Sequence, residues 1–400
     1  MEIRQGFKFR LKPKHQQIVK MRQFAGCCRF VWNKALALEK EIYEETGKRL
    51  GYNKLAGLLV EWKKEDVMAF LKDAHSQILQ QALRNLDKAY LNFFEKRAKL
   101  PKFKKKGLND SFSYPQGFKI DENNSRIYLP KIGWIRYVKH RRISGIPKNV
   151  TVSQSCGQWY VSIQTERVIA EPVHQSQSEV GIDLGVAHFA SFSDGSHLAP
   201  LNTFRKYADK LAKFQRKLAK KVKFSSNWKK LKFRIQKLHK KIVDIRRDFL
   251  HKATSTISKN HALVVVEDLQ IKNMSSSASG TMENPGRNVR VKSGLNKSIL
   301  DQGWGEFVRQ LEYKLGWLGG VLLRVAPQYT SQKCSQCGHI SKDNRKTQAK
   351  FKCMACGFEA NADHNAALNI LAAGHAVSAC GAERARASVL KQEPACDAAL

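Results

Sequence analysis

Residues 180–186 read Val-Gly-Ile-Asp-Leu-Gly-Val, an apolar run that a single carboxylate, Asp183, interrupts. A short apolar run of this length is typical of a buried strand. A charged side chain inside such a strand is costly to remove from water unless it binds a cation or another partner. The segment therefore predicts a buried strand whose acidic residue belongs to a binding site.

Two further carboxylates fit the same site. Glu267 lies near the end of a second apolar run that starts at Ala262, and Asp363 begins a helical motif. Because neighbouring residues of a strand point to opposite faces, only one of Glu267 and Asp268 can share a site with Asp183. We choose Glu267, because the helix that Asp363 begins could pack beside both strands.

In a chain whose formal net charge is +37, a cluster of three carboxylates indicates a specific binding site. A cluster of Asp183, Glu267 and Asp363 fits a place where Mg²⁺ ions offset the carboxylates and bridge to phosphate oxygens. By pattern alone, each of the three could instead be a turn residue or a helix N-cap. The sequence leaves both interpretations open at this point.

The segments around these acids alternate between helices and strands. Amphipathic helices are predicted at 204–222 and 228–249, a further helix at 304–317 and a strand at 321–325. Such alternation is typical of an α/β domain. Residues 201–250 carry 18 Lys or Arg against three Asp, which form either a solvated helix face or a set of phosphate contacts.

Four cysteines form a metal-binding pattern. Cys334 and Cys337 are separated by two residues, fifteen residues follow, and Cys353 and Cys356 repeat the spacing, each pair being followed by Gly. Two intervening residues let one tight turn point both sulfurs at a single ion, and glycine permits the positive φ of such turns. Four thiolates leave no open coordination position, so the pattern predicts structural Zn²⁺.

The N-terminal half combines helices with a small all-β unit. Apolar residues recur at helical spacing from Ile18 to Ala35 and from Ser76 to Arg97, and the basic stretch 99–106 marks a subdomain boundary. From residue 112 to 165 the apolar period changes to two, which predicts strands. A strand at 7–11 could be the detached first strand of that unit.

The composition limits the partners and the compartment. The 400 residues include 71 Lys plus Arg against 34 Asp plus Glu, so an anionic partner, nucleic acid or membrane surface, is expected. No apolar run is long enough to span a bilayer, and charges stand where a signal peptide needs apolar residues. The nine cysteines suggest no disulfide framework. We expect a cytoplasmic, nucleoid-associated protein that is not secreted.

Several motifs together resemble one known family. In chain order they are Phe30-Val-Trp-Asn-Lys34, Gln81-Ala-Leu-Arg-Asn-Leu-Asp-Lys-Ala-Tyr-Leu-Asn-Phe-Phe94, Gly181-Ile-Asp-Leu-Gly185, Val264-Val-Val-Glu-Asp-Leu269, Tyr329-Thr-Ser-Gln-Lys-Cys-Ser-Gln-Cys-Gly338 and Asp363-His-Asn-Ala-Ala367. The set resembles the transposon-encoded TnpB (OrfB-type) family, which is related to the type V CRISPR nucleases. The resemblance covers nearly the whole chain except the tail. One departure is Ala362, where many members have Arg.

The resemblance implies an α+β multidomain fold. Its N-terminal half would be helical with a small β-barrel, followed by an RNase H-like (RuvC) α/β nuclease domain with an inserted four-cysteine zinc ribbon. The implied domains are a wedge-like β-barrel that binds nucleic acid (1–12 and 107–172), a helical recognition domain (13–106), a RuvC-like nuclease domain (173–330), the zinc ribbon (331–358), a RuvC-like C-terminal helix (359–375) and a disordered tail (376–400).

The resemblance also implies an activity, an RNA-guided and Mg²⁺-dependent DNA endonuclease encoded by a transposable element. Asp183, Glu267 and Asp363 would hold two Mg²⁺ ions, one activating a water and the other stabilising the leaving 3′ oxygen. A guide RNA from the transposon end would read the double-stranded target by base pairing, while the protein reads a short flanking motif. The implied assembly is a monomeric ribonucleoprotein.

Two other functions fit the same residues. The chain could be a non-cleaving, RNA-guided DNA-binding repressor, which relatives become when the acidic triad decays, although all three acids are present here. It could also be a protein-only DNA transposase that uses the same metal chemistry without a guide. Metal-dependent cutting of DNA that requires RNA would separate the three functions.

Overall fold

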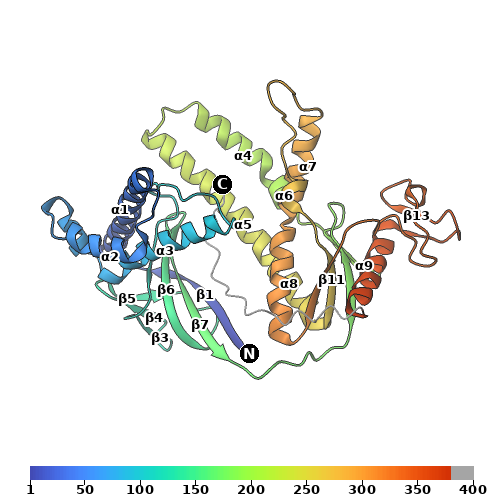
Figure 1. Ribbon diagram of the computed structural model, residues 1–400, viewed down its shortest axis with the longest axis horizontal. Helices are drawn as coiled ribbons and strands as arrows, with labels where there is room; N and C mark the ends of the chain where they lie inside the picture. The colour runs from blue at the N-terminus through green and yellow to red at the C-terminus, as the bar shows by residue number, and fades with distance from the viewer. Residues whose placement is uncertain (380–400) are drawn as a thin grey trace. The chain divides into compact units, whose positions relative to one another are not determined.

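The computed structural model describes residues 1–379, which form two compact units that divide between Ile169 and Ala170. Each unit combines helices with a sheet (Figure 1). Of the tail expected to be disordered, residues 376–379 are the end of helix α9 (Ala362–Ala379), and the remainder lies outside the described residues. No helix within residues 1–379 is both long and apolar enough to cross a membrane.

The first unit is built on a seven-stranded antiparallel sheet with the order β2-β6-β7-β1-β5-β4-β3. Its strands are β1 (Glu2–Lys12), β2 (Ser111–Tyr114), β3 (Lys119–Asp121), β4 (Arg126–Leu129), β5 (Gly133–Tyr137), β6 (Ile146–Ser155) and β7 (Gln158–Val168). Strand β1 pairs with β7 along most of its length, and its last two residues pair with β5. The first strand of the chain thus joins the two halves of this sheet.

The expected β-barrel is wrong, because this sheet is open. Closure would require the two edge strands to pair with each other, but β2 pairs only with β6 and β3 only with β4. The edge strands have four and three residues. Strand β2 packs instead against helices α1 (His15–Thr46) and α3 (Ser76–Phe94).

The helices of the first unit share one core with the sheet. They are α1, α2 (Gly51–Trp62), the 3₁₀ helix η1 (Asp66–Lys72) and α3. Helix α1 extends well beyond the predicted apolar stretch and ends at Gly47, whose φ of 67° is left-handed and whose N–H donates to the Tyr43 carbonyl. Phe24 of α1 and Phe9 of β1 are almost fully buried in the common core.

The second unit contains a five-stranded sheet with the order β10-β9-β8-β11-β12. The strands are β8 (Glu179–Asp183), β9 (Ala190–Phe192), β10 (His197–Leu198), β11 (Leu263–Glu267) and β12 (Val321–Val325). Strands β8, β11 and β12 run parallel, whereas β9 is antiparallel to β8 and β10 is antiparallel to β9. Because these three strands run in the same direction, they end at one edge of the sheet. Parallel neighbours also require crossover connections, which are usually helical.

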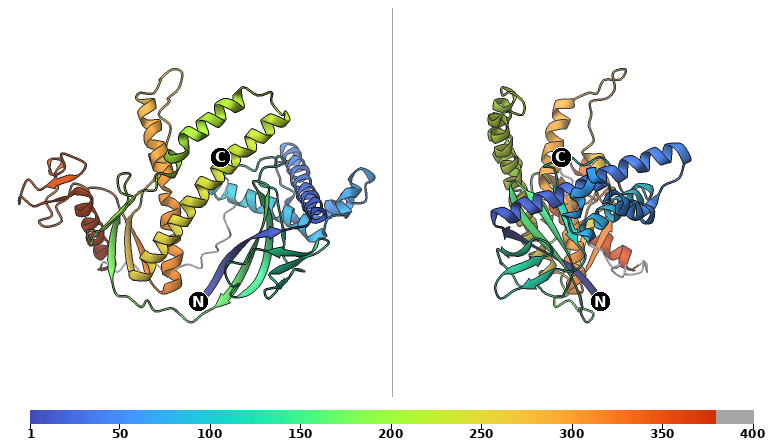
Figure 2. Two further views of the ribbon diagram at one scale, coloured as in Figure 1. Left: turned by 180° about the vertical axis from the view of Figure 1, so that it is seen from behind. Right: turned by 90° about the vertical axis from the view of Figure 1, so that its left-hand side faces the viewer.

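The crossovers are helical. Helices α4 (Thr203–Ala219) and α5 (Ser226–Asn260) precede β11, and α6 (Ile271–Met274), α7 (Val289–Gln302) and α8 (Trp304–Leu318) precede β12. Helices α4 and α5 run side by side as a hairpin (Figure 2), joined by a small core around Leu211, Leu238 and Ile242. Most of the strongly basic stretch 201–250 lies on this hairpin.

Helices cover both faces of the five-stranded sheet. On one face, Val264 and Val266 of β11 share a core with Leu250 of α5 and Phe307 of α8. On the other face, Val265 packs with Ile370 of α9. Alternate residues of each parallel strand therefore face α5 and α8 or face α9.

Glycines bring α9 into direct contact with the sheet. A Cβ on Gly181 of β8 would lie 2.3 Å from the Ala367 carbonyl oxygen and 2.7 Å from the Leu371 amide nitrogen. A Cβ on Gly374 of α9 would lie 2.5 Å from a methyl carbon of Val265. At Gly181 a larger residue would displace the backbone of the helix, whereas at Gly374 it would displace the Val265 side chain or the helix.

We predict that Gly181→Ala lowers the free energy of unfolding by about 1–3 kcal/mol, the usual cost of overpacking a well-packed core. The new methyl group would meet the α9 backbone, which cannot rotate away as a side chain could. Denaturant unfolding of the purified protein measures the change.

The matched control is Gly294→Ala in α7, where a Cβ would meet no atom within 4 Å. This variant should gain up to about 1 kcal/mol, because alanine favours a helix over glycine. Wild-type stability of Gly181→Ala would show that α9 does not lie against β8 in this way.

Candidate functional site

Asp183 and Glu267 lie at the same edge of the five-stranded sheet. Each is the last residue of its strand, and β8 and β11 are parallel neighbours in a register that places the two acids side by side. Gly181, two residues before Asp183, contacts α9, and Val265, two residues before Glu267, packs with α9. Since residues two apart in a strand share a face, both carboxylates lie on the α9 face.

Asp363 reaches this edge from the first turn of α9. It stands one turn before Ala367, the residue that contacts Gly181, so both lie on the same side of the helix. The helix start is capped by Asn361, whose Oδ1 accepts from the backbone N–H of Asp363 at 2.9 Å and of His364 at 3.2 Å. Asp363 itself is therefore not needed as the N-cap.

The three carboxylates influence one another electrostatically. Burial raises the pKa of Asp183 to about 7, and the negative charges of Glu267 and Asp363 add to this shift. Burial also raises the pKa of Glu267, opposed by a hydrogen bond in which the Thr330 hydroxyl donates to Glu267 Oε1 at 2.5 Å. Buried, mutually repelling carboxylates are typical of sites that hold a cation.

Two residues that the sequence did not single out complete the site. Thr330 holds Glu267, and Arg345 Nη2 pairs with Asp363 Oδ1 at 2.9 Å. Arg345 follows the 3₁₀ helix η2 (Lys342–Asn344) between the two cysteine pairs, and its charge opposes the rise in the pKa of Asp183. Their roles depend on how loops fold, so no periodicity or spacing could have identified them.

The departure at Ala362 has a structural reason. Ala362 is completely buried and packs with Cys334, Phe351 and Cys353. An arginine at this position would have to leave that small core. The guanidinium beside Asp363 comes from Arg345 instead.

The carboxylate set fits magnesium. Asp183, Glu267 and Asp363 offer only oxygen ligands, which Mg²⁺ prefers. Their ligand atoms are less tightly gathered than those of the four cysteines. Within residues 1–379, the cysteines are the one group of three or more His, Cys, Asp or Glu residues whose ligand atoms all lie within 4.8 Å of one another. Mg²⁺ keeps several waters and needs only one or two direct carboxylates, so this spacing suits it.

The four cysteines converge on one point. Cys334 Sγ lies 3.8 Å from Cys356 Sγ, and Cys337 Sγ lies 3.5 Å from Cys353 Sγ. Tetrahedral zinc with Zn–S bonds of about 2.3 Å requires sulfurs about 3.8 Å apart, so the donor set fits Zn²⁺. The predicted convergence is confirmed, whereas the identity of the ion stays a prediction.

The two cysteine turns have the same geometry. The N–H of Gly338 donates to the Cys334 carbonyl, and the N–H of Gly357 donates to the Cys353 carbonyl, both at 3.0 Å. The glycine φ angles are 78° and 75°, which glycine adopts without strain. The short strands β13 (Lys350–Lys352) and β14 (Glu359–Asn361) pair with each other on either side of the second turn.

Two buried asparagines of α9 join the cysteine-rich ribbon to the acidic edge. Asn365 Nδ2 donates to the Lys333 carbonyl at 2.8 Å, and its Oδ1 accepts from the Ser335 N–H at 3.0 Å. Asn369 Nδ2 donates to the carbonyls of Lys333 and Thr330. Because Thr330 also holds Glu267, the ribbon, α9 and the β11 carboxylate form one connected network.

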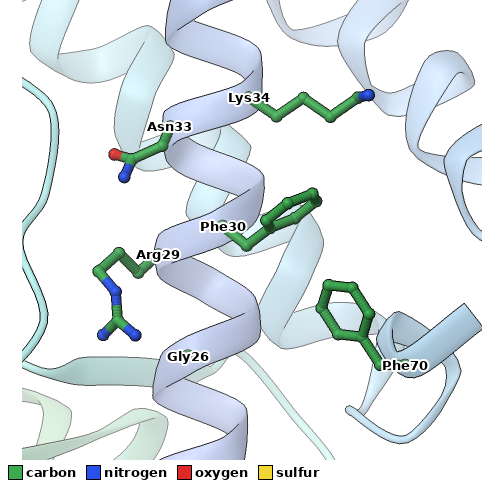
Figure 3. Close-up of a pocket in the computed structure, with 6 residues that line it drawn as sticks. All are labelled: Gly26, Arg29, Phe30, Asn33, Lys34 and Phe70. Carbon is green, nitrogen blue, oxygen red and sulfur yellow. The ribbon is translucent and has the colours of Figure 1, made fainter. Parts of the chain in front are cut away.

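The first unit carries a separate candidate surface. It is a pocket with a volume of about 670 Å³. Gly26, Arg29, Phe30, Asn33, Lys34 and Phe70 line it (Figure 3). The Phe30 and Phe70 rings meet edge to face, and Phe70 is 41% exposed. Asn33 bonds to both the N–H and the carbonyl of Lys104, which fixes the basic segment 99–106 against α1. Exposed aromatic and cationic side chains together are typical of nucleic-acid surfaces.

Comparison with protein families gives three matches along the chain. Residues 147–278 match the OrfB IS605 family, described as "Probable transposase", and residues 304–370 match a "Cas12f1-like, TNB domain". Residues 1–48 match the helix-turn-helix domain of the same OrfB family.

Two curated relatives span almost the whole chain. "Putative RNA-guided DNA endonuclease InsQ" from Escherichia coli K12 is 58% identical over 394 residues, 98% of each chain. "Putative RNA-guided DNA endonuclease" from Streptomyces pristinaespiralis is 33% identical over 407 aligned positions, 98% of this chain and 97% of the relative.

A solved structure shares the fold. It is the Cas12f1–sgRNA–target DNA complex, whose protein matches with a TM-score of 0.58 at 15% identity and covers 92% of this chain and 98% of its own. At this identity the likeness concerns the fold alone.

We predict that stability in buffer without added divalent cation falls as the pH rises from about 5 to 7. The pKa of Asp183 is raised to about 7, whereas an unfolded Asp titrates near 3.9. Across this window the folded chain therefore binds the extra proton, and the free energy of unfolding falls with rising pH. Asp183→Asn removes the titrating group, so the stability of the variant relative to wild type should grow up to about pH 7 and then level off.

Thermal unfolding of both proteins in steps from about pH 5.5 to 8, which spans the raised pKa, measures this difference. Effects of titrating groups that do not interact with Asp183 cancel in the comparison, whereas Glu267 and Asp363 lie close enough to respond to the loss of its charge. A difference that stays constant across the range would mean that Asp183 is ionised throughout.

We predict that Cys353→Ser loses zinc and destabilises the second unit. Structural zinc contributes on the order of 10 kcal/mol in small zinc peptides, and the core of the ribbon has few buried apolar residues to replace it. Elemental analysis and thermal unfolding measure both effects. Cys156→Ser is the matched control, because Cys156 lies in the β6–β7 turn, away from the cluster. Wild-type protein without zinc would contradict the assignment.

Proposed function

This chain belongs to the TnpB (OrfB-type) family, which is related to the type V CRISPR nucleases, and from that premise we propose that it is an RNA-guided DNA endonuclease. The convergence of three carboxylates from distant parts of the sequence on one edge of the sheet carries this proposal. The names of the relatives support the same activity.

We assign the nuclease domain to residues 173–330 and 359–375, with residues 331–358 as its zinc ribbon. Strands β8, β9 and β10 alternate in direction, and β11 and β12 run parallel to β8. This arrangement, with acids at the ends of β8 and β11, supports an RNase H-like (RuvC) domain. We assign residues 1–12 and 107–172 to a nucleic-acid-binding sheet domain and residues 13–106 to a helical recognition domain.

Asp183, Glu267 and Asp363 would hold the catalytic Mg²⁺. Two ions bound there supply an activated water and stabilise the leaving 3′ oxygen in phosphodiester hydrolysis. Thr330 keeps the Glu267 carboxylate oriented, and Arg345 offsets the charge of Asp363. Burial of Asp183 keeps bulk water from its carboxylate, which strengthens its interaction with a cation.

The partners we propose are a guide RNA and a double-stranded target DNA with a short flanking motif, held in a monomeric ribonucleoprotein. The net charge of +37 suits two polyanions. Cations lie over exposed or half-buried aromatic rings in both units, at 4.8 Å for Arg84 over Tyr52 and 4.6 Å for Lys237 over Phe233. Such pairs offer both phosphate contacts and base stacking.

We predict that Asp183→Ala or Glu267→Ala lowers cleavage of guide-matched DNA by more than about 100-fold, since altering a metal site only indirectly already costs about 10–100-fold. Binding of the DNA should stay close to wild type, because affinity comes mainly from Lys and Arg against phosphates. Cleavage and gel-shift assays on the reconstituted ribonucleoprotein measure both. Asp248→Ala is the control, an exposed acid that pairs with Lys252 on α5.

The outcomes also separate the alternatives. Near wild-type cutting by either variant would overturn the site. A wild-type complex that binds its target but never cuts it would favour the repressor.

We predict that the protein purifies with a structured RNA transcribed from beside its own gene. Because the contacts are mainly ionic, affinity should fall by on the order of 10³-fold or more between about 50 and 200 mM salt. Expression with and without the native flanks of the gene, followed by sequencing of the bound RNA, tests this. An RNA-free preparation that cuts a specific DNA site would favour the protein-only transposase.

A further inference from the structure

The pocket on α1 offers the surfaces of two aromatic rings. Phe30 of α1 and Phe70 of η1 meet edge to face, with their ring centroids 5.2 Å apart. This arrangement covers only one face of one ring, and Phe70 is 41% exposed. Flat apolar surface of this kind suits an aromatic ligand.

The pocket also carries positive charge. Figure 3 shows Arg29 on the opposite side of α1 from Phe70, and Lys34 one turn beyond Phe30. The Lys34 ammonium lies 5.2 Å from the centroid of the Trp62 ring, a contact that leaves its charge unneutralised. None of the six described residues that line the pocket is acidic. The pocket therefore favours a ligand that is both aromatic and anionic.

Arg29 keeps hydrogen-bond donors for such a ligand. Its Nη1 pairs with Asp110 Oδ1 at 2.9 Å, and Asp110 Oδ2 accepts from the N–H of Gly107 at 3.2 Å. Arg29 Nη2 lies at the pocket floor, 3.7 Å from where a Cβ on Gly26 would stand. Since a guanidinium carries five N–H donors, the ion pair with Asp110 leaves others for a ligand.

Gly26 is a glycine that packing does not explain. It lies in the interior of the 32-residue helix α1, where glycine is less favourable than alanine. A Cβ there would meet Arg29 Nη2 at an ordinary contact distance, so the protein itself leaves room for a side chain. A ligand that rests directly on the helix backbone would account for the glycine.

We propose that this pocket binds one unpaired base of the guide RNA. The base would stack against Phe70 and rest on the backbone at Gly26, with Arg29 donating to its edge and Lys34 contacting the adjoining phosphate. The proposal rests on the RNA-guided function proposed above. The volume of about 670 Å³ lies within the roughly 300–1,000 Å³ of small-ligand sites, which is enough for one nucleotide.

RNA fits this pocket better than the double-stranded target does. Structured RNA presents unpaired bases in its loops and bulges, and proteins stack such bases on aromatic side chains. A base of the DNA duplex would first have to be unstacked and unpaired, which costs free energy.

The first test measures the affinity of full-length variants for the RNA that copurifies with the wild-type protein. Phe70→Ala should bind about 5- to 100-fold more weakly, the effect of losing one stacked base. Stacking is not ionic, so the slope of log affinity against log salt concentration should stay unchanged. Lys34→Gln should instead reduce that slope by about one, as expected for a phosphate contact. Val67→Ala is the matched control, an exposed apolar residue of η1 that does not line the pocket.

The second test separates binding from folding. Gly26→Ala should raise the melting temperature, because alanine favours a helix, and yet weaken RNA binding by about 5-fold or more, the lower end of the stacking effect. Gly57→Ala in α2, where a Cβ would meet no atom within 4 Å, should raise the melting temperature and bind as wild type. A loss of affinity in a more stable protein cannot come from unfolding.

Ultraviolet crosslinking identifies the occupant. We expect the peptide that contains Phe70 to crosslink to one unpaired nucleotide of the RNA. Crosslinking of that peptide to target DNA instead, or wild-type affinity of either Phe70→Ala or Gly26→Ala, would overturn the proposal, while guided cutting by the wild-type complex would leave the nuclease function standing. A wild-type protein that binds no RNA would overturn the RNA-guided function and this proposal together.

Discussion

The direct contact between α9 and β8 at Gly181 is the constraint on which the second unit depends. With no side chain at Gly181, the strand approaches the Ala367 carbonyl of the helix closely. That approach fixes the height of α9 on the sheet, and Asp363, one turn before Ala367, is carried to the edge where Asp183 and Glu267 end their strands. A displaced helix would separate Asp363 from the other two acids.

Contacts around α9 also stabilise the three acids that lie close together in this strongly basic protein. Burial, and to a smaller extent repulsion by Glu267 and Asp363, raises the pKa of Asp183, so the cluster is a source of instability that packing elsewhere must offset. Thr330 and Arg345 reduce this cost by bonding to Glu267 and Asp363. Both residues are positioned by the cysteine-rich ribbon and its asparagine contacts with α9. Loss of zinc would consequently disturb the positions of Thr330 and Arg345 at the acidic edge as well as the ribbon itself.

Sequence reasoning worked where a local pattern carries the information. Cysteine spacing predicted that four sulfurs meet, since two residues between thiols fix a single turn geometry, and the structure brings them together. Alternation along residues 262–268 meant that only one of Glu267 and Asp268 could share a site with Asp183, and β11 shows the same alternation between its two faces. The choice of Glu267 came from the expected packing of the helix that Asp363 begins. Sheet closure failed as a prediction, because it depends on whether β2 and β3 meet, and periodicity within a strand says nothing about its distant partner. Arg345 and Thr330 escaped notice for a similar reason, because their contacts arise from loops that fold around the ribbon.

The most direct test is to locate the divalent ion. Crystals of the ribonucleoprotein grown with Mn²⁺ in place of Mg²⁺ would show the metal by its anomalous scattering. We predict a peak within ligand distance of Asp183, Glu267 and Asp363, with the Arg345–Asp363 pair rearranged. Mn²⁺ bound only elsewhere, with that ion pair intact, would contradict the view that the packing of α9 on Gly181 assembles a metal centre.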